Sequence, residues 1–148
     1  MNYLEKPNQK LKQEIRQLPK TVTDVIIINS PNLIRQVKAR WIIGKSVNGG
    51  RIGEYRSPDY KAYKLMINPS AGGYVDLMLT GSLVENLIVK PLGNTAFEML
   101  STDSKYDKLS KKYGKQEFGL SDDEWAEFSY EISHFILQDI LEKSYELL

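Results

Sequence analysis

The chain has 148 residues, of which 41% are hydrophobic and 26% are charged, with no cysteine and one histidine. These values are typical of one compact globular domain and argue against a disordered or fibrous chain. The absence of thiols excludes disulfides, cysteine nucleophiles and cysteine metal sites, and His134 alone cannot form a multi-histidine site. No apolar run approaches the roughly 18 residues of a membrane span, and residues 1–20 are too polar for a signal-peptide core, so we expect a soluble, unsecreted protein.

The net charge of +1 conceals a strong asymmetry along the chain. Residues 1–74 contain 13 lysines and arginines against 5 acids, whereas residues 75–148 contain 7 against 14. Eight of the acids lie in residues 121–148, shortly after a lysine cluster over residues 105–115. Such asymmetry predicts either pairing within the chain or a basic face that meets an acidic face of another copy, and two solvated faces without a partner are the plain alternative.

The N-terminal part of the chain is expected to be helical or extended as an arm. Residues 1–20 form a polar arm or a helix that stops at Pro19, and residues 21–148 form a single domain. Residues 21–28 fit a strand or a helix, and a helix is favoured.

A second helix is predicted to begin at Ser30, with Pro31 in its first turn, and to reach Gly44. A glycine-rich loop is expected over residues 48–53, followed by mostly loop with short extended pieces over residues 55–74. The residues expected to shape this loop and the next chain reversal are Asn48, Gly49, Gly50, Gly53, Thr80 and Gly81.

Three strands are predicted over residues 74–79, 83–90 and 95–100, and their closeness favours an antiparallel meander. Thr102 or Asp103 is then expected to cap a short helix that runs to residue 112 and is ended by Gly114.

The last helix has the clearest signal in the sequence. Ser121 and Glu124 have the spacing of a capping box, and the acids in the first turn suit the helix dipole. Its predicted apolar stripe consists of Trp125, Phe128, Ile132, Phe135, Ile136 and Ile140. The fold class that follows is α+β, a small antiparallel β-sheet packed by N-terminal helices and a long C-terminal helix.

None of the motifs that suggest catalysis has a suitable context. Residues 39–46 loosely match a P-loop, but Trp41 and its neighbours are too bulky to form a phosphate cradle. His134 is expected to be a packed or boundary side chain, and the acids at residues 122–124 are explained by the capping box and the dipole. We therefore predict no enzyme, no catalytic, cofactor-binding or metal site, and no cofactor.

The lysine cluster and the tyrosines predict binding surfaces. The lysines, with Tyr106 and Tyr113 among them, could contact phosphates and stack on bases, but the neighbouring acidic helix would repel nucleic acid. Direct contact with DNA is therefore not favoured, although a small nucleic-acid-associated or regulatory binding protein that uses Lys105–Lys115 is the alternative function. Trp41 and Trp125 are expected in the core. The expected interface residues are Tyr55, Tyr60, Lys105, Lys108, Lys111, Lys112, Glu127 and Glu131.

An ordered series of motifs runs through residues 33–140. It consists of residues 36–41, the loop GKSVNGGRIG at residues 44–53, Tyr55, Tyr60 and Lys64, the segment VDLMLTG at residues 75–81, Tyr113-Gly114, and FGLS at residues 118–121. Together these motifs resemble small virion proteins of tailed phages that complete the neck or tail. The composition fits phages of AT-rich hosts, with crAss-like phages of gut bacteria as a candidate source.

The resemblance implies a structural virion protein without catalytic activity, a head-tail connector, tail-completion or ring protein. It implies a homo-oligomeric ring at the phage head-tail junction, whose partners are other copies of the chain and the portal, neck or tail proteins, with no membrane. The implied location is the head-tail region of the virion, and the host cytoplasm during assembly. It leaves open whether the ring is twelve-fold or six-fold.

Overall fold

The computed structural model describes residues 5–78, 80–93 and 96–145. The helices in this part of the chain are α1 (Glu5–Ile28), α2 (Ser30–Ile42), α3 (Pro58–Ile67), α4 (Ser82–Glu85), α5 (Tyr106–Tyr113) and α6 (Asp122–Tyr145), with short 3-10 turns at Pro69–Ala71 and Lys115–Phe118. The strands β1 (Leu87–Leu92) and β2 (Ala96–Ser101) pair antiparallel, with Val89 opposite Met99. The predicted α+β class is confirmed.

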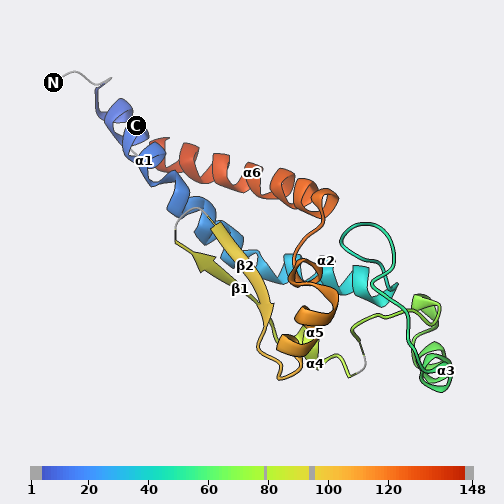
Figure 1. Ribbon diagram of the computed structural model, residues 1–148. Coiled ribbons are helices and arrows are strands. Elements are labelled where there is room, and N and C mark those ends of the chain that lie inside the picture. Colours follow the sequence, from blue (N-terminus) through green and yellow to red (C-terminus); the bar gives the residue numbers. More distant parts are fainter. Residues whose placement is uncertain (1–4, 79, 94–95, 146–148) are drawn as a thin grey trace.

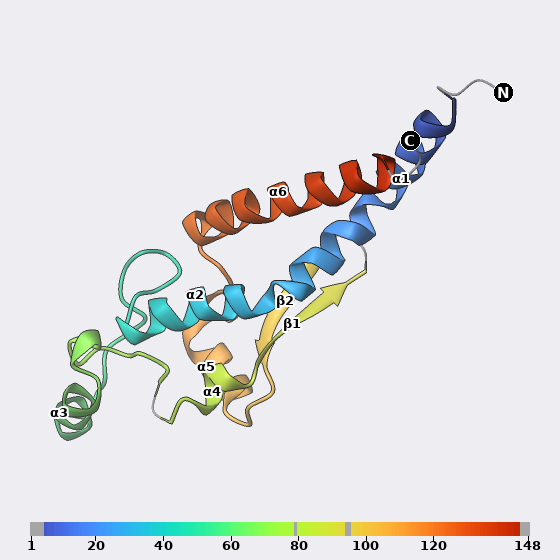
Figure 2. The ribbon, with the colours of Figure 1, turned by 180° about the vertical axis from the view of Figure 1, so that it is seen from behind.

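The molecule is elongated around the line formed by α1 and α2 (Figure 1). Helix α6 runs back along α1, while the β-sheet contacts α1 and α2 through β1. Helix α3 lies at one end of the molecule, and the far end of α6 lies beside α1 at the other (Figure 2). Helix α2 therefore separates α6 on one side from α3, α4 and α5 on the other.

The core is built around α2, whose Leu33, Val37 and Trp41 are fully buried. The Trp41 ring meets the edge of Phe118, with ring centroids 5.2 Å apart. Phe128 of α6 is also fully buried. The core thus joins residues from both halves of the sequence, and the prediction of Trp41 as a core residue is confirmed.

The first two helices differ from the prediction at their ends. Residues 21–28 are helical, as favoured, but α1 continues through Pro19, so the predicted stop there is wrong. A proline removes one hydrogen-bond donor, and in this helix, which packs along α6, that loss does not end the helix. Residues 5–20 are helical, and the division into that segment and a domain from residue 21 remains a prediction. The cap of α2 is also displaced by one residue, because Ser30 is already helical and Asn29 precedes it.

The middle of the chain contains the largest errors of prediction. Helix α3 forms where mostly loop was expected, since Ser57 caps it by accepting a hydrogen bond from the Tyr60 amide and Pro58 occupies its first turn. Residues 74–78 are not a strand, because this described part of the prediction has only an isolated bridge between Glu54 and Tyr74, and residue 79 lies outside the described residues. Residues 83–90 begin in α4 and become a strand only at Leu87, whereas the third predicted strand is confirmed as β2.

The helix signals of the second half are mostly confirmed. The Ser121 amide donates to Glu124 Oε2 at 2.8 Å and the Glu124 amide donates to Ser121 Oγ at 3.2 Å, which completes the capping box. Gly114 ends α5 with φ of 99°, while Asp103 contributes by accepting a hydrogen bond from the Lys105 amide instead of acting as the N-cap. In the predicted stripe of α6, however, Trp125 is 41% exposed and Phe135 is 59% exposed. Trp125 lies against Phe97, with ring centroids 5.6 Å apart, but the prediction that it is a core residue is wrong.

The glycines of the loop after α2 have different roles. Gly49 has the expected positive φ, but Gly50 does not, and a β-carbon at Gly50 would meet nothing within 4 Å. The demanding position is Gly44, where φ is 66° and a β-carbon would lie 3.2 Å from the carbonyl oxygen of Val75 and 3.4 Å from Ala71. Gly44 is thus the position at which the end of α2 requires glycine.

We predict that Gly44→Ala lowers the free energy of unfolding by about 1–3 kcal/mol, through backbone strain and the close approach to Val75. Gly50→Ala is the matched control and should change it by less than about 0.5 kcal/mol. Urea unfolding of both variants measures the difference. Equal stabilities would show that the chain after α2 does not need a left-handed residue.

Candidate functional site

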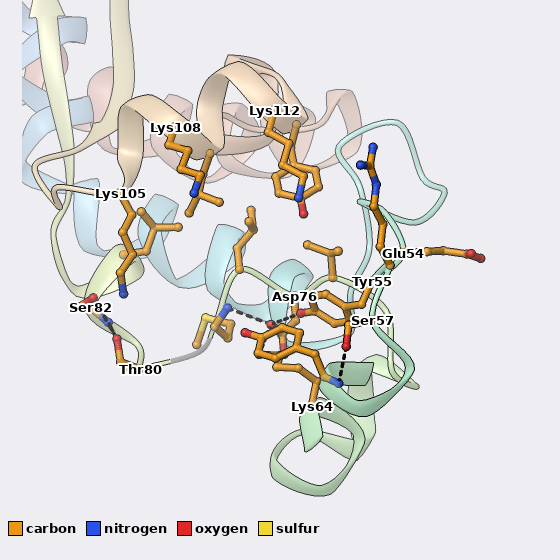
Figure 3. Close-up of a pocket in the computed structure, with 18 of the residues that line it drawn as sticks. Glu54, Tyr55, Ser57, Lys64, Asp76, Thr80, Ser82, Lys105, Lys108 and Lys112 are labelled. Atoms are coloured by element: carbon orange, nitrogen blue, oxygen red, sulfur yellow. Dashed lines mark hydrogen bonds and ion pairs between the residues drawn. The ribbon is translucent and has the colours of Figure 1, made fainter. Parts of the chain in front are cut away.

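A cavity of about 510 Å³ lies between α5, the segment before α3 and the segment that leads into α4 (Figure 3). We call it the lysine cavity, because Lys105, Lys108 and Lys112 of α5 line it. These lysines are three and four residues apart, so the helix places them on one face. The apolar walls come from Val75, Leu77, Met78, Leu83 and Leu109.

The charges around the lysine cavity are mainly positive. Arg56 joins the lysines in the lining, and the side chain of the acid Glu54 points away from the cavity (Figure 3). Among the residues that the structure describes, none of Lys105, Lys108 and Lys112 forms an ion pair. Their charges therefore remain available to an anionic group from outside the chain.

The floor of the lysine cavity contains a buried ion pair. Lys64 Nζ lies 2.6 Å from Asp76 Oδ1, and the two side chains are 2% and 1% exposed. Removing two charges from water is costly unless the remaining hydrogen-bonding capacity is also used. Here Asn68 Nδ2 donates to Asp76 Oδ2 at 2.8 Å and the Met78 amide donates to Asp76 Oδ1 at 3.0 Å. The pair thus fixes α3 against the segment before α4.

The backbone beside this pair has an uncommon conformation. Leu77 has φ of 55°, in the left-handed region that side chains other than glycine rarely adopt. The hydrogen bond from the Met78 amide to the Asp76 carboxylate closes a turn around Leu77, whose side chain is buried. The described part of the strand predicted for residues 74–79 does not form, because the left-handed φ of Leu77 interrupts the extended backbone.

The ion pair and its surroundings perturb the acidity of two groups. Burial by itself raises the pKa of Asp76, but the hydrogen bonds from Lys64, Asn68 and the Met78 amide lower it overall. Burial and then the charge of Asp76 raise the pKa of Tyr55, so its hydroxyl stays protonated. That hydroxyl lies 3.4 Å from Asp76 Oδ1, to which it donates. Asp76 is thus a buried, ionised and fully occupied acceptor, which is a structural role.

A second polar cluster fixes the glycine-rich loop to the segment before α6. Arg40, which is 5% exposed, pairs with Glu124 and donates to the carbonyl oxygens of Glu117 and Gly119 at 2.6 and 2.9 Å. The Glu117 carboxylate accepts from Ser46 Oγ at 2.5 Å and from the Val47 amide at 3.1 Å. Since Ser46 is held by Glu117, the loose P-loop match forms no phosphate cradle.

The structure brings most of the expected interface residues together. Tyr55, Tyr60, Lys105, Lys108 and Lys112 all line the lysine cavity, and the Tyr55 and Tyr60 rings meet edge to face at 5.0 Å. Lys111, although exposed on the same helix, does not line it.

The acidic members of that set lie elsewhere. Glu127 and Glu131 are exposed on α6, which α2 separates from α5. In the described part of the chain neither pairs with a lysine, so pairing within the chain does not account for the charge asymmetry of these residues.

Lys64 and Asp76 were missed as a pair by reasoning from sequence, although a signal was present. Asp76 is the one charged residue in an otherwise apolar run over residues 75–79, which is typical of a buried and paired acid. Its partner, Lys64, could not be identified from the sequence, because residues 55–74 were expected to be mostly loop and the helix α3 that carries Lys64 was not predicted.

Several classes of site find no support in the described residues. They contain no group of three or more histidine, cysteine, aspartate or glutamate side chains that could hold a metal ion. His134, expected to be a packed or boundary side chain, is exposed, and its ring meets that of Tyr130 edge to face, with ring centroids 5.0 Å apart. Within the described ranges, no helix has the length and apolar character needed to span a bilayer. No family model, curated protein or solved structure matched this chain when it was compared with them.

We predict that Asp76→Asn lowers the free energy of unfolding by about 3–5 kcal/mol at pH 7, because it leaves Lys64 charged and buried without its partner. Asp59→Asn, an exposed position on the same helix as Lys64, is the control and should cost less than about 1 kcal/mol. Chemical unfolding of the three proteins at pH 7 gives these values, and equal losses would refute the role of the pair.

The same pair predicts a dependence on pH. Because the folded protein lowers the pKa of Asp76, its contribution to stability is complete above the ordinary carboxyl pKa of about 4 and is lost as the pH falls through the lower folded value. The difference in stability between the parent and Asp76→Asn should therefore shrink as unfolding is measured from pH 5 downwards. A difference that stays constant to pH 2 would contradict this assignment.

Proposed function

We propose that this chain is a structural virion protein that forms a homo-oligomeric ring at the phage head-tail junction, as a neck, connector or tail-completion subunit. The observation that carries the proposal is the apolar surface that one copy leaves uncovered. Tyr130, Leu137 and Leu141 on α6 are 70%, 58% and 51% exposed. Since α6 also buries Phe128 and Ile132, it has apolar side chains on both its inner and outer faces.

Helix α3 supports the same conclusion at the other end of the molecule. Tyr63, Leu65, Met66 and Ile67 are each at least 45% exposed, and Met66 is 81% exposed. Among the residues of α3, only Lys64 is buried. Exposed apolar patches of this kind mark surfaces that bind other proteins. A subunit with such patches at separate places can contact two neighbours at once, as a ring requires.

The partners in this proposal are other copies of the chain and the portal, neck or tail proteins of the virion. In this proposal the chain acts without catalysis or cofactor. Its two polar clusters, which contain the pairs of Lys64 with Asp76 and Arg40 with Glu124, join segments of its own fold. The protein works in the head-tail region, after assembly in the host cytoplasm.

We predict that the purified chain forms a discrete large oligomer, visible as closed rings by electron microscopy, without nucleic acid. Opposite charges on separate faces steer encounter more than they hold a finished contact, so raising salt should slow assembly more than it dissociates rings. Light scattering measures the rate of assembly after the protein is diluted from denaturant or its concentration is raised suddenly. Mass photometry measures the fraction of protein that remains in finished rings. A protein that stays monomeric, even when it is mixed with portal and tail proteins of a tailed phage, would overturn the proposal.

The second candidate is a small nucleic-acid-associated protein that uses the lysine cavity. It is favoured by Lys105, Lys108 and Lys112, which form no ion pair among the described residues and lie beside Tyr55 and Tyr60, since basic side chains and aromatic rings together bind single strands. Purified protein that carries DNA at low salt and loses it at high salt would support this function, whereas an oligomer free of DNA would oppose it.

A further inference from the structure

The lysine cavity has a mixed chemistry that defines what can fill it. Its walls are apolar, through Leu77, Leu83 and Leu109, and one side presents the ammonium groups of Lys108 and Lys112. A ligand that fits must bury an apolar group and place negative charges beside it. The apolar walls favour a protein side chain with flanking acids over a nucleic-acid backbone, which would offer phosphates to the lysines but leave the walls uncovered.

The outer face of α6 carries these groups close together. Tyr130 is 70% exposed, with Glu127 three residues before it and Glu131 directly after it. Tyrosine is enriched at the centres of protein interfaces because it buries a large ring and keeps a polar end. Both glutamates are exposed. Their charges are therefore free to meet cations of another molecule.

The spacing of the charges is the same on both surfaces. Lys108 and Lys112 are four residues apart on α5, as are Glu127 and Glu131 on α6, which is about 6 Å along a helix axis. Two helices that lie side by side can therefore form both pairs at once. This match holds whichever direction the two helices run.

These two surfaces face different sides of the molecule. Helix α6 lies on one side of α2, and helix α5 lies on the other (Figures 1 and 2). The lysines of α5 line the cavity. A chain therefore cannot fill its cavity with its own α6. A second copy can, and because the two surfaces differ, the contact is head-to-tail and repeats from copy to copy.

We propose that Tyr130 of one copy enters the lysine cavity of the next, with Glu127 and Glu131 pairing with Lys108 and Lys112. This inference rests on the proposed function and identifies the contact from which the ring is built. The tyrosine supplies most of the affinity, because exposed ion pairs contribute little individually, and the charges select the partner and its register.

The first test uses the absence of native cysteine in the chain. Lys108→Cys and Glu131→Cys are made in separate proteins, which are mixed and treated with a short thiol-specific crosslinker. We expect a crosslinked species that joins positions 108 and 131, and a second one that joins positions 108 and 127 when Glu127→Cys is used instead. The pair that gives the higher yield of crosslink shows in which direction α6 runs along α5 of the other copy. Lys111→Cys, exposed on α5 but outside the cavity lining, is the matched control and should crosslink less.

The second test measures self-association of full-length variants that are first shown to be folded by circular dichroism. Tyr130→Ser should weaken association about tenfold or more, as loss of a central aromatic does. Ile28→Ser, at an apolar residue that is 76% exposed at the end of α1 and outside both exposed patches and the cavity lining, is the control and should not. The double variant Lys108→Glu, Lys112→Glu should block association, and adding Glu127→Lys and Glu131→Lys should partly restore it. Lys38→Glu with Lys90→Glu controls for net charge.

The outcomes separate this inference from the proposed function. Rings that form equally well in the Tyr130→Ser and lysine variants would overturn the inference and leave the ring intact. A parent that stays monomeric, together with no crosslink between the cysteine variants, would overturn both. Loss of DNA from the lysine variants, with unchanged association, would assign the cavity to nucleic acid and also overturn the inference.

Discussion

The buried pair of Lys64 and Asp76 is the interaction on which the arrangement of the lysine cavity depends. It joins α3 to the segment before α4, and Asn68 extends the connection to α2 by donating to both Asp76 and the carbonyl oxygen of Ile42. Apart from Lys64, α3 buries none of its side chains. Without the pair, hydrophobic burial would do little to hold this helix, so a charge interaction replaces the usual apolar face.

The second cluster provides a similar connection on the other side of α2. Arg40 draws together the two carbonyl groups before α6 and the carboxylate of Glu124. Glu124 therefore has two roles, since it also completes the capping box with Ser121. The start of α6, the end of α2 and the glycine-rich loop after α2 are thus linked through a few side chains. These links position α6 relative to α2, and so they influence which residues of α6 face outwards.

Features set by neighbours in sequence were predictable, whereas features set by distant residues were not. The capping box and the glycine that ends α5 depend on residues within a few positions, and both were found. Helix α3 was missed although Ser57-Pro58 repeats the Ser30-Pro31 pattern, because tyrosines and breakers suggested a loop. The strand expected over residues 74–79 is interrupted at Leu77, which has a left-handed φ and follows Asp76. The ion pair of Asp76 with the distant Lys64 is a contact that no local pattern reveals. For the lysine cavity, the lysines and tyrosines of the lining were predicted from the sequence as interface residues, but the buried ion pair of Lys64 and Asp76 was not.

The packing of α1 against α6 has a consequence for how the chain acquires its structure. These helices are made first and last among the described elements, so at ribosomal rates α1 waits on the order of ten seconds for its partner. During that time Ile26 and its apolar neighbours have no cover from α6. A core closed by distant segments forms slowly and late. The outward face of α6 is therefore complete only after α6 has been made and has packed on α1, which delays any association through that face until these two helices have met.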